Sequence, residues 1–189
     1  MKRPSLNTKL IKYAALLRGI TPANPRMRNE KLREFFESLG FTNVQTVIAS
    51  GNVLFETRSN NIKQLETKIE NALPEKLGFN SATIVRSLEQ LQEIVKNNPF
   101  GKIQDTSRSR LNVTFLKNTP KELLRIPHRA ENGTFALLGI FDGAIYSAID
   151  LASSKTPDLM AWLDRQFGKQ ITTRTWKTLG KIIKKLDAS

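Results

Sequence analysis

The chain has 189 residues, of which 39% are hydrophobic and 25% charged, so it can bury a core as one large domain or two small ones. The absence of cysteine and the single histidine exclude disulfide scaffolds, thiolate metal centres, cysteine nucleophiles and multi-histidine metal sites, so we expect neither a metal nor a cofactor. Thirty lysines and arginines against 17 acidic residues give a net charge of +13, which favours anionic partners.

The first half of the chain predicts alternating strands and helices after an N-terminal tail over residues 1–11. Short apolar runs indicate strands, and apolar residues at helical spacing indicate helices. The expected strands cover 13–17, 44–48, 53–55 and 82–85, and the expected helices run from Asn29 to Gly40 and over 62–73. Residues 49–52 form the expected hairpin turn. The order βαββαβ over 12–86 is that of a ferredoxin-like plait.

A helix and loop over 87–109 link this half to a second one, with Ser87 as the expected helix N-cap. The second half repeats the same order and adds a C-terminal helix. Its expected strands are 111–116, 134–141, 144–149 and an edge strand at 170–172, and its expected helices are 120–125, 156–168 and 173–186. Thr156 and Pro157 would open the middle helix as N-cap and first helical residue. The predicted fold class is α+β, with two ferredoxin-like (βαββαβ) plait halves, 12–86 and 110–189, packed together.

The sequence also predicts the cellular location of the protein. No segment has the roughly 18–20 uncharged residues that a membrane span requires. The apolar run at 13–17, behind the basic N-terminus, is too short for the core of a signal peptide. We therefore expect a cytoplasmic protein with no membrane partner.

The excess positive charge is concentrated at the two ends of the chain. Residues 1–40 carry a net charge of +6 and residues 151–189 one of +5, whereas residues 41–100 are neutral overall. Three lysines share one face of the last expected helix: Lys177, Lys181 and Lys184. The opposite stripe of that helix is apolar, with Trp176, Leu179, Ile183 and Leu186. The basic surface is either a solvated helix face or a row of contacts for phosphate oxygens.

Three motifs carry a family resemblance, at residues 13–20 (YAALLRGI), 47–55 (VIASGNVLF) and 172–178 (TTRTWKT). With shorter collinear matches they span residues 13–186, and the chain resembles the bacterial domain-of-unknown-function 1697 family. The resemblance implies an α+β fold of two plait-like halves and no known activity. The family usually has a glycine-rich loop after its Arg-Gly-Ile motif. Here residues 21–27 carry prolines instead of the glycines that would let the backbone approach a ligand closely.

A first candidate ligand site lies where the first strand ends. The expected antiparallel pairing of the 13–17 and 53–55 strands brings Arg18 and Gly19 close to Ser50, Gly51 and Asn52. A guanidinium, a hydroxyl, an amide and turn N–H groups would then face one anion. The alternative is structural, because Gly51 and Asn52 tolerate positive φ in a turn.

A second candidate ligand site precedes the last helix. Thr173 and Arg174 would offer a hydroxyl, a guanidinium and free helix N–H groups to a phosphate. The alternative is an ordinary threonine N-cap with Trp176 packed into the core. His128 is expected at the surface, and no residue is assigned a catalytic or metal-binding role.

Three functions are compatible with these features. The first is non-catalytic binding of an anionic ligand, either nucleic acid or a phosphorylated molecule, through the basic surfaces. The second is an enzyme or sensor acting on a small phosphorylated or carboxylate metabolite in a cleft near Arg18 and Asn52. The third is a structural or interaction module whose charge only serves solubility. Because acid–base and metal-binding residues are scarce, we favour the first.

Overall fold

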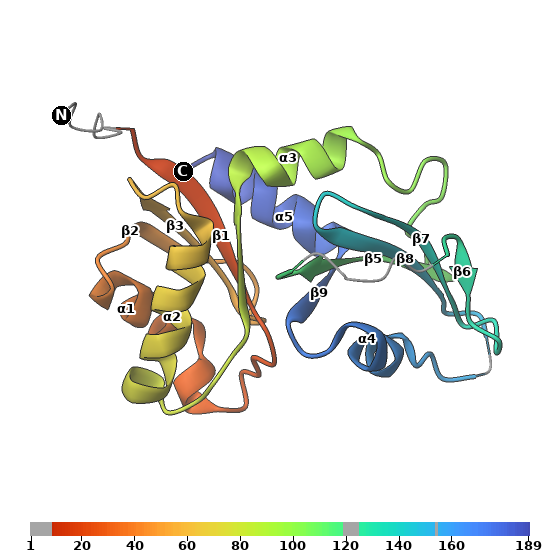
Figure 1. Ribbon diagram of the computed structural model, residues 1–189, viewed down its shortest axis with the longest axis horizontal. Helices are drawn as coiled ribbons and strands as arrows, with labels where there is room; N and C mark the ends of the chain where they lie inside the picture. Colours follow the sequence, from red (N-terminus) through yellow and green to blue (C-terminus); the bar gives the residue numbers. More distant parts are fainter. Residues whose placement is uncertain (1–8, 119–124, 154) are drawn as a thin grey trace. The chain divides into compact units, whose positions relative to one another are not determined.

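The computed structural model describes residues 9–118, 125–153 and 155–189 (Figure 1). These residues form two compact units. The first unit comprises the described residues up to Leu88 together with Lys185–Ser189, and the second unit comprises Glu89–Lys184. The described residues form two antiparallel sheets and five α-helices, so the predicted α+β class is confirmed.

The first unit has the order of strands and helices expected for residues 12–86. Its elements are β1 (Ile11–Leu17), the 3₁₀ helix η1 (Pro25–Met27), α1 (Asn29–Ser38), β2 (Thr42–Thr46), β3 (Asn52–Thr57), α2 (Ile62–Leu77) and β4 (Thr83–Ser87). The sheet order is β2-β3-β1-β4, and every neighbouring pair is antiparallel. The first strand begins at Ile11, one residue inside the expected tail.

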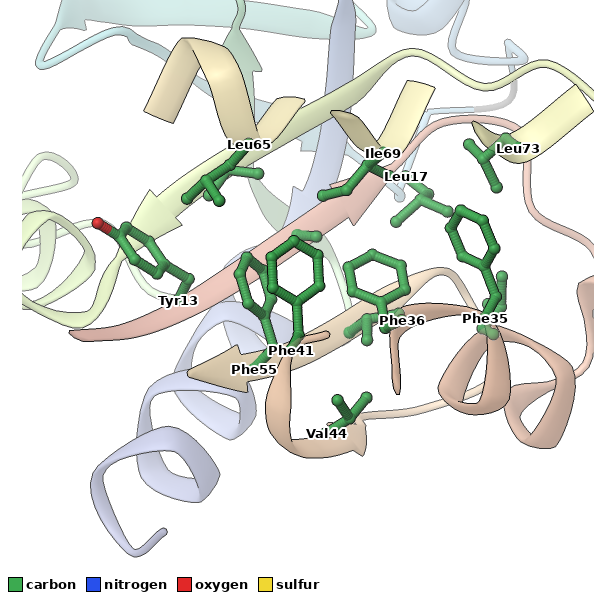
Figure 2. Packing of buried hydrophobic residues seen from close by; sticks show 14 residues of the cluster. Tyr13, Leu17, Phe35, Phe36, Phe41, Val44, Phe55, Leu65, Ile69 and Leu73 are labelled. Atoms are coloured by element: carbon green, nitrogen blue, oxygen red, sulfur yellow. The ribbon is translucent and has the colours of Figure 1, made fainter. Parts of the chain in front are cut away.

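One face of this sheet forms an aromatic core with α1 and α2 (Figure 2). Side chains alternate between the two faces of a strand, so Tyr13 and Leu17 of β1 point to the same side. The Phe55 ring lies at the centre of the core, with its centroid 4.4 Å from Phe41 and 5.6 Å from Phe36. Each fully buried side chain of this size stabilises the fold by roughly 1.5–3 kcal/mol.

The edge strand β4 has its outward N–H groups capped by two glutamates of α2. Glu70 Oε1 accepts a hydrogen bond from Thr83 N at 2.8 Å, and Glu66 Oε1 accepts one from Val85 N at 3.0 Å. Glu66 is only 4% exposed, so its carboxylate is a buried acceptor. Open N–H groups on a sheet edge invite pairing with another chain. The two glutamates therefore satisfy the backbone of β4 and close this edge.

The second unit is built around a five-stranded antiparallel sheet in the order β6-β7-β8-β5-β9. The elements of this part of the chain are α3 (Leu88–Lys96), β5 (Ser109–Leu116), β6 (His128–Arg129), β7 (Phe135–Phe141), β8 (Ala144–Asp150), α4 (Leu159–Phe167), β9 (Ile171–Thr175) and α5 (Trp176–Asp187). Asp142 and Gly143 join β7 and β8 at φ values of +52° and +67°, as expected for the predicted hairpin turn. Of the helix expected at 120–125, residues 120–124 lie outside the described residues.

Helices cover both faces of this second sheet (Figure 1). On one face, Leu163 of α4 packs with Leu116 and Ile145 of the sheet. α3 and α5 lie over the other face, where the Phe100 and Trp176 rings are 5.0 Å apart. None of the helices in the described part of the chain is long and apolar enough to cross a membrane.

Three details of the predicted helices are wrong. α4 starts at Leu159 rather than after Thr156, so Asp158 occupies the N-cap position. α5 starts at Trp176 rather than at 173, because Ile171–Thr175 pairs with β5 along its whole length. The buried stripe of α5 consists of Leu179, Ile182 and Leu186, whereas Ile183, expected in that stripe, is half-buried.

Candidate functional site

The end of β1 and the β2–β3 turn are adjacent in the first unit. Leu17 N donates a hydrogen bond to Gly51 O at 2.9 Å. Arg18 continues the chain on the β4 side, where its N donates to Ala82 O at 2.9 Å and its O accepts from Ser81 Oγ at 2.8 Å. The backbone of Arg18 is therefore fixed between this turn and the start of β4.

Asn52 uses its side-chain amide within the turn. Its Nδ2 donates to Val47 O and to Ser50 Oγ, both at 2.9 Å, and the residue is only 1% exposed. These two bonds occupy both N–H donors of the amide. They give Asn52 a structural role in the turn, and its role as an anion ligand stays a prediction.

Backbone strain is present in the same turn. Ile48 has a φ of +59°, a region in which a β-branched residue is an outlier, and the residue is 45% exposed. An L-residue in this conformation costs about 1–2 kcal/mol. The exposed Ile48 side chain recovers little of that cost through burial.

We expect Ile48→Gly to raise the free energy of unfolding by about 1 kcal/mol, because glycine adopts positive φ without a Cβ clash. Urea unfolding measures the change. Ala49→Gly is the matched control, since Ala49 is exposed, lies next to Ile48 and does not have positive φ. The control should lose a few tenths of a kcal/mol through added chain entropy. If the Ile48→Gly variant were less stable than the parent chain, the inference that Ile48 is strained would be refuted.

Residues 21–27, the segment with Pro22 and Pro25, form a compact turn. Asn24 N donates to Thr21 O at 3.1 Å, and Asn24 Oδ1 accepts from Arg26 N at 3.0 Å. Pro25 opens the short helix η1, a position where its missing N–H group costs nothing. A Cβ atom on Gly78 would collide with the Arg26 guanidinium, so this turn and the end of α2 are in close contact.

The candidate residues before α5 lie within a strand, not at the helix terminus. Thr173 Oγ1 is 2.8 Å from Thr114 Oγ1 on the neighbouring strand β5. Arg174 is 8% exposed, and its Nη1 donates to Thr172 Oγ1 and to Thr173 O, both at 2.8 Å. Burial lowers the pKa of Arg174 to about 10, so it stays a cation at neutral pH. The helix cap is Thr175, whose Oγ1 accepts from Thr178 N at 3.2 Å.

The lysine row of α5 is exposed as predicted. Lys177, Lys181 and Lys184 are all exposed, on the side of the helix away from its buried stripe. Lys177 Nζ lies 3.9 Å from Asp105 Oδ2, which links the start of α5 to the loop after α3. Lys181 and Lys184 are thus exposed to solvent, and Lys177 is exposed while its ammonium group also contacts this carboxylate.

A cavity in the second unit brings together residues that were not predicted to form a site. His128 of β6 and Trp162 of α4 stack with ring centroids 4.9 Å apart and 25° between their planes. Together with Asp158 and Arg165 they line a cavity of about 440 Å³. The spacing of Asp158, Trp162 and Arg165 on one helix side was a signal that could have grouped them. Among the described residues, no group of three or more histidine or acidic side chains could hold a metal ion.

The comparisons with known proteins concern the family and the fold. A family model described as "Protein of unknown function (DUF1697)" matches residues 10–137. The chain belongs to the DUF1697 family. No curated protein matches this DUF1697 chain in sequence. A conserved bacterial protein from Streptococcus pneumoniae is similar in structure, with a TM-score of 0.72 and 23% identity, over 95% of this chain and 99% of that chain. At this identity the similarity establishes the fold alone.

Proposed function

We propose that this DUF1697 member binds a polyanion, with nucleic acid as the first candidate, through a basic surface on its second unit and without catalysis. We assign to this surface six exposed cations from α5, the loop before β5 and the start of β5: Lys102, Arg108, Arg110, Lys177, Lys181 and Lys184. The row of three exposed lysines on α5 carries the proposal. Its spacing of about one and two helical turns matches a ligand with repeated negative charges better than a single small anion.

The loop side of the basic surface is held in shape by its own hydrogen bonds. Thr106 Oγ1 accepts from Arg108 N at 3.1 Å and from Ser109 N at 3.2 Å, and Thr106 N donates to Ser109 O at 3.0 Å. The contact between Asp105 and Lys177 places this loop beside the first turn of α5. A preformed loop loses less conformational entropy on binding, which supports its role as part of an interface.

Whether the sheet faces are open or covered decides between two ways of binding nucleic acid. We infer that both units are ferredoxin-like plaits, which the order β2-β3-β1-β4 supports in the first unit and β7-β8-β5-β9 supports in the second. RNA-binding plaits stack bases on aromatic side chains of an open sheet face. In the second unit α4 covers one face and α3 and α5 lie over the other (Figure 1). Contacts from the α5 cations to phosphates are therefore the better-supported mode.

The proposal predicts salt-dependent binding that depends on the α5 lysines. Labelled single- and double-stranded DNA and RNA oligonucleotides should bind at about 0.05 M salt, with affinity falling as salt rises because phosphate contacts release counterions. The double variant Lys181→Gln/Lys184→Gln should weaken binding about tenfold and reduce the salt slope by about 2. Fluorescence anisotropy over a salt series measures both quantities.

A matched control separates this surface from net charge. Lys63→Gln/Lys76→Gln removes two exposed lysines of α2 and changes the net charge by the same amount. It should leave the affinity and the salt slope nearly unchanged. No binding at low salt, a salt-independent affinity, or equal losses in the two double variants would refute the proposal.

A further inference from the structure

The cavity beside His128 and Trp162 has two walls from different parts of the second unit. One wall is a side of α4, where Asp158, Trp162 and Arg165 follow i, i+4, i+7 spacing. The other wall is β6 and the turn after it, with His128 and Glu131. A volume of about 440 Å³ lies in the range of small-molecule sites.

Hydrogen bonds hold the turn that forms the second wall. Ala130 N donates to Phe135 O at 3.0 Å and closes the turn. Asn132 Oδ1 accepts from Thr134 N at 3.1 Å and from Thr134 Oγ1 at 2.7 Å. The turn that carries Glu131 is therefore held by its own backbone and by the Asn132 side chain.

Three aromatic side chains form part of the lining of the cavity. The His128 and Trp162 rings stack, and the Phe135 ring meets Trp162 edge-on with centroids 5.7 Å apart and 60° between the planes. Such a group of rings offers an apolar surface for the body of a ligand. It also attracts a cation placed over a ring face.

The charged groups that line the cavity have both signs. Glu131 and Asp158 can bind an ammonium group, and Arg165 can bind a carboxylate. Arg165 Nη2 lies 3.7 Å from Asp158 Oδ2, and the two side chains are 61% and 46% exposed. Such an exposed pair contributes little, so both groups can turn to a ligand. A simple anion would meet two carboxylates and a simple cation would meet a guanidinium, so a ligand with both charges fits best.

We infer that this cavity binds a small zwitterion of the amino-acid class, with an apolar or aromatic side chain over the His128–Trp162 stack. The ammonium group is recognised by Glu131 and Asp158, and the carboxylate by Arg165. This site is independent of the polyanion proposal, because none of the six cations of the basic surface lines the cavity.

Tryptophan fluorescence tests the inference directly. The chain has two tryptophans, so Trp176→Phe leaves Trp162 as the only one. Titration of the full-length variant with the standard amino acids, up to about 10 mM, should change its emission saturably for an amino acid with an apolar or aromatic side chain. Calorimetry replaces fluorescence for amino acids that themselves emit. The matching amine without a carboxylate and the matching acid without an ammonium should each bind at least about tenfold more weakly.

Two exposed charge variants keep the test independent of folding. Arg165→Gln and Glu131→Gln should fold like the parent chain and each weaken binding of the responding amino acid about tenfold. Lys169→Gln, an exposed cation that does not line the cavity, is the control and should bind normally. No response to any amino acid, equal binding of the singly charged analogues, or unchanged affinity in both charge variants would overturn the inference.

Discussion

Replacing Gly51 with alanine is expected to lower the free energy of unfolding by about 2–4 kcal/mol, because two effects add. Gly51 has a φ of +73°, which costs an L-residue about 1–2 kcal/mol. An alanine Cβ would also lie 2.5 Å from Ile20 Cγ1 and 2.9 Å from Ile20 Cβ. Ile20 packs against the core of the first unit, and Gly51 O accepts from Leu17 N, so neither side can move freely.

Gly19→Ala separates the two effects. Gly19 has nearly the same φ, +72°, but a Cβ there would meet no atom within 4 Å. This variant should therefore lose only the conformational part, about 1 kcal/mol. Urea unfolding of both variants gives the difference. Equal losses would mean that Ile20 moves aside without cost and would refute the close contact at Gly51.

Replacing Glu66 with alanine is expected to cost about 2–3 kcal/mol of unfolding free energy. Its carboxylate accepts from Val85 N, and both residues are buried, so the variant leaves a buried N–H group without its acceptor. Glu66→Gln retains an oxygen acceptor and should cost only about 1 kcal/mol. Thermal or urea unfolding measures both.

Glu75→Ala is the control on the same helix, since Glu75 is exposed. It should change the unfolding free energy by no more than about 0.5 kcal/mol. Light scattering adds a second readout, because an uncapped β4 edge should associate more readily. If Glu66→Ala were as stable as Glu75→Ala, the carboxylate would not be the acceptor that closes β4.

Local patterns predicted most of the fold, and the errors arose where distant residues decide. The hairpin at Asp142-Gly143 follows from turn chemistry alone. β6 is only two residues long and exists because His128 pairs with Leu137, which local alternation cannot reveal. The start of α5 was placed too early because pairing with β5 keeps residues 173–175 in the sheet. At α4, Thr156 and Asp158 are both good N-caps, and burial of Leu159 accompanies the later start.

The candidate sites were harder to predict because their side chains have other partners. The expected antiparallel pairing placed the end of β1 beside the turn before β3, where Leu17 N donates to Gly51 O. It could not predict the hydrogen bonds that occupy the Asn52 amide. The residues around Arg174 in the sequence are polar, and this local pattern does not predict that Arg174 is buried. Helical spacing groups only the α4 side of the cavity at His128; it does not predict that β6 and α4 meet across some thirty residues of chain.

The segment Lys185–Ser189 belongs to the first unit although it follows the whole of the second in the chain. Lys185 Nζ donates to Thr46 O at 3.0 Å, and Lys12 Nζ donates to the backbone oxygens of Asp187 and Ser189. During translation, all four strands of the first unit leave the ribosome long before this segment is synthesised. A nascent chain can therefore assemble that sheet early, but it completes the unit only after the second one has been made.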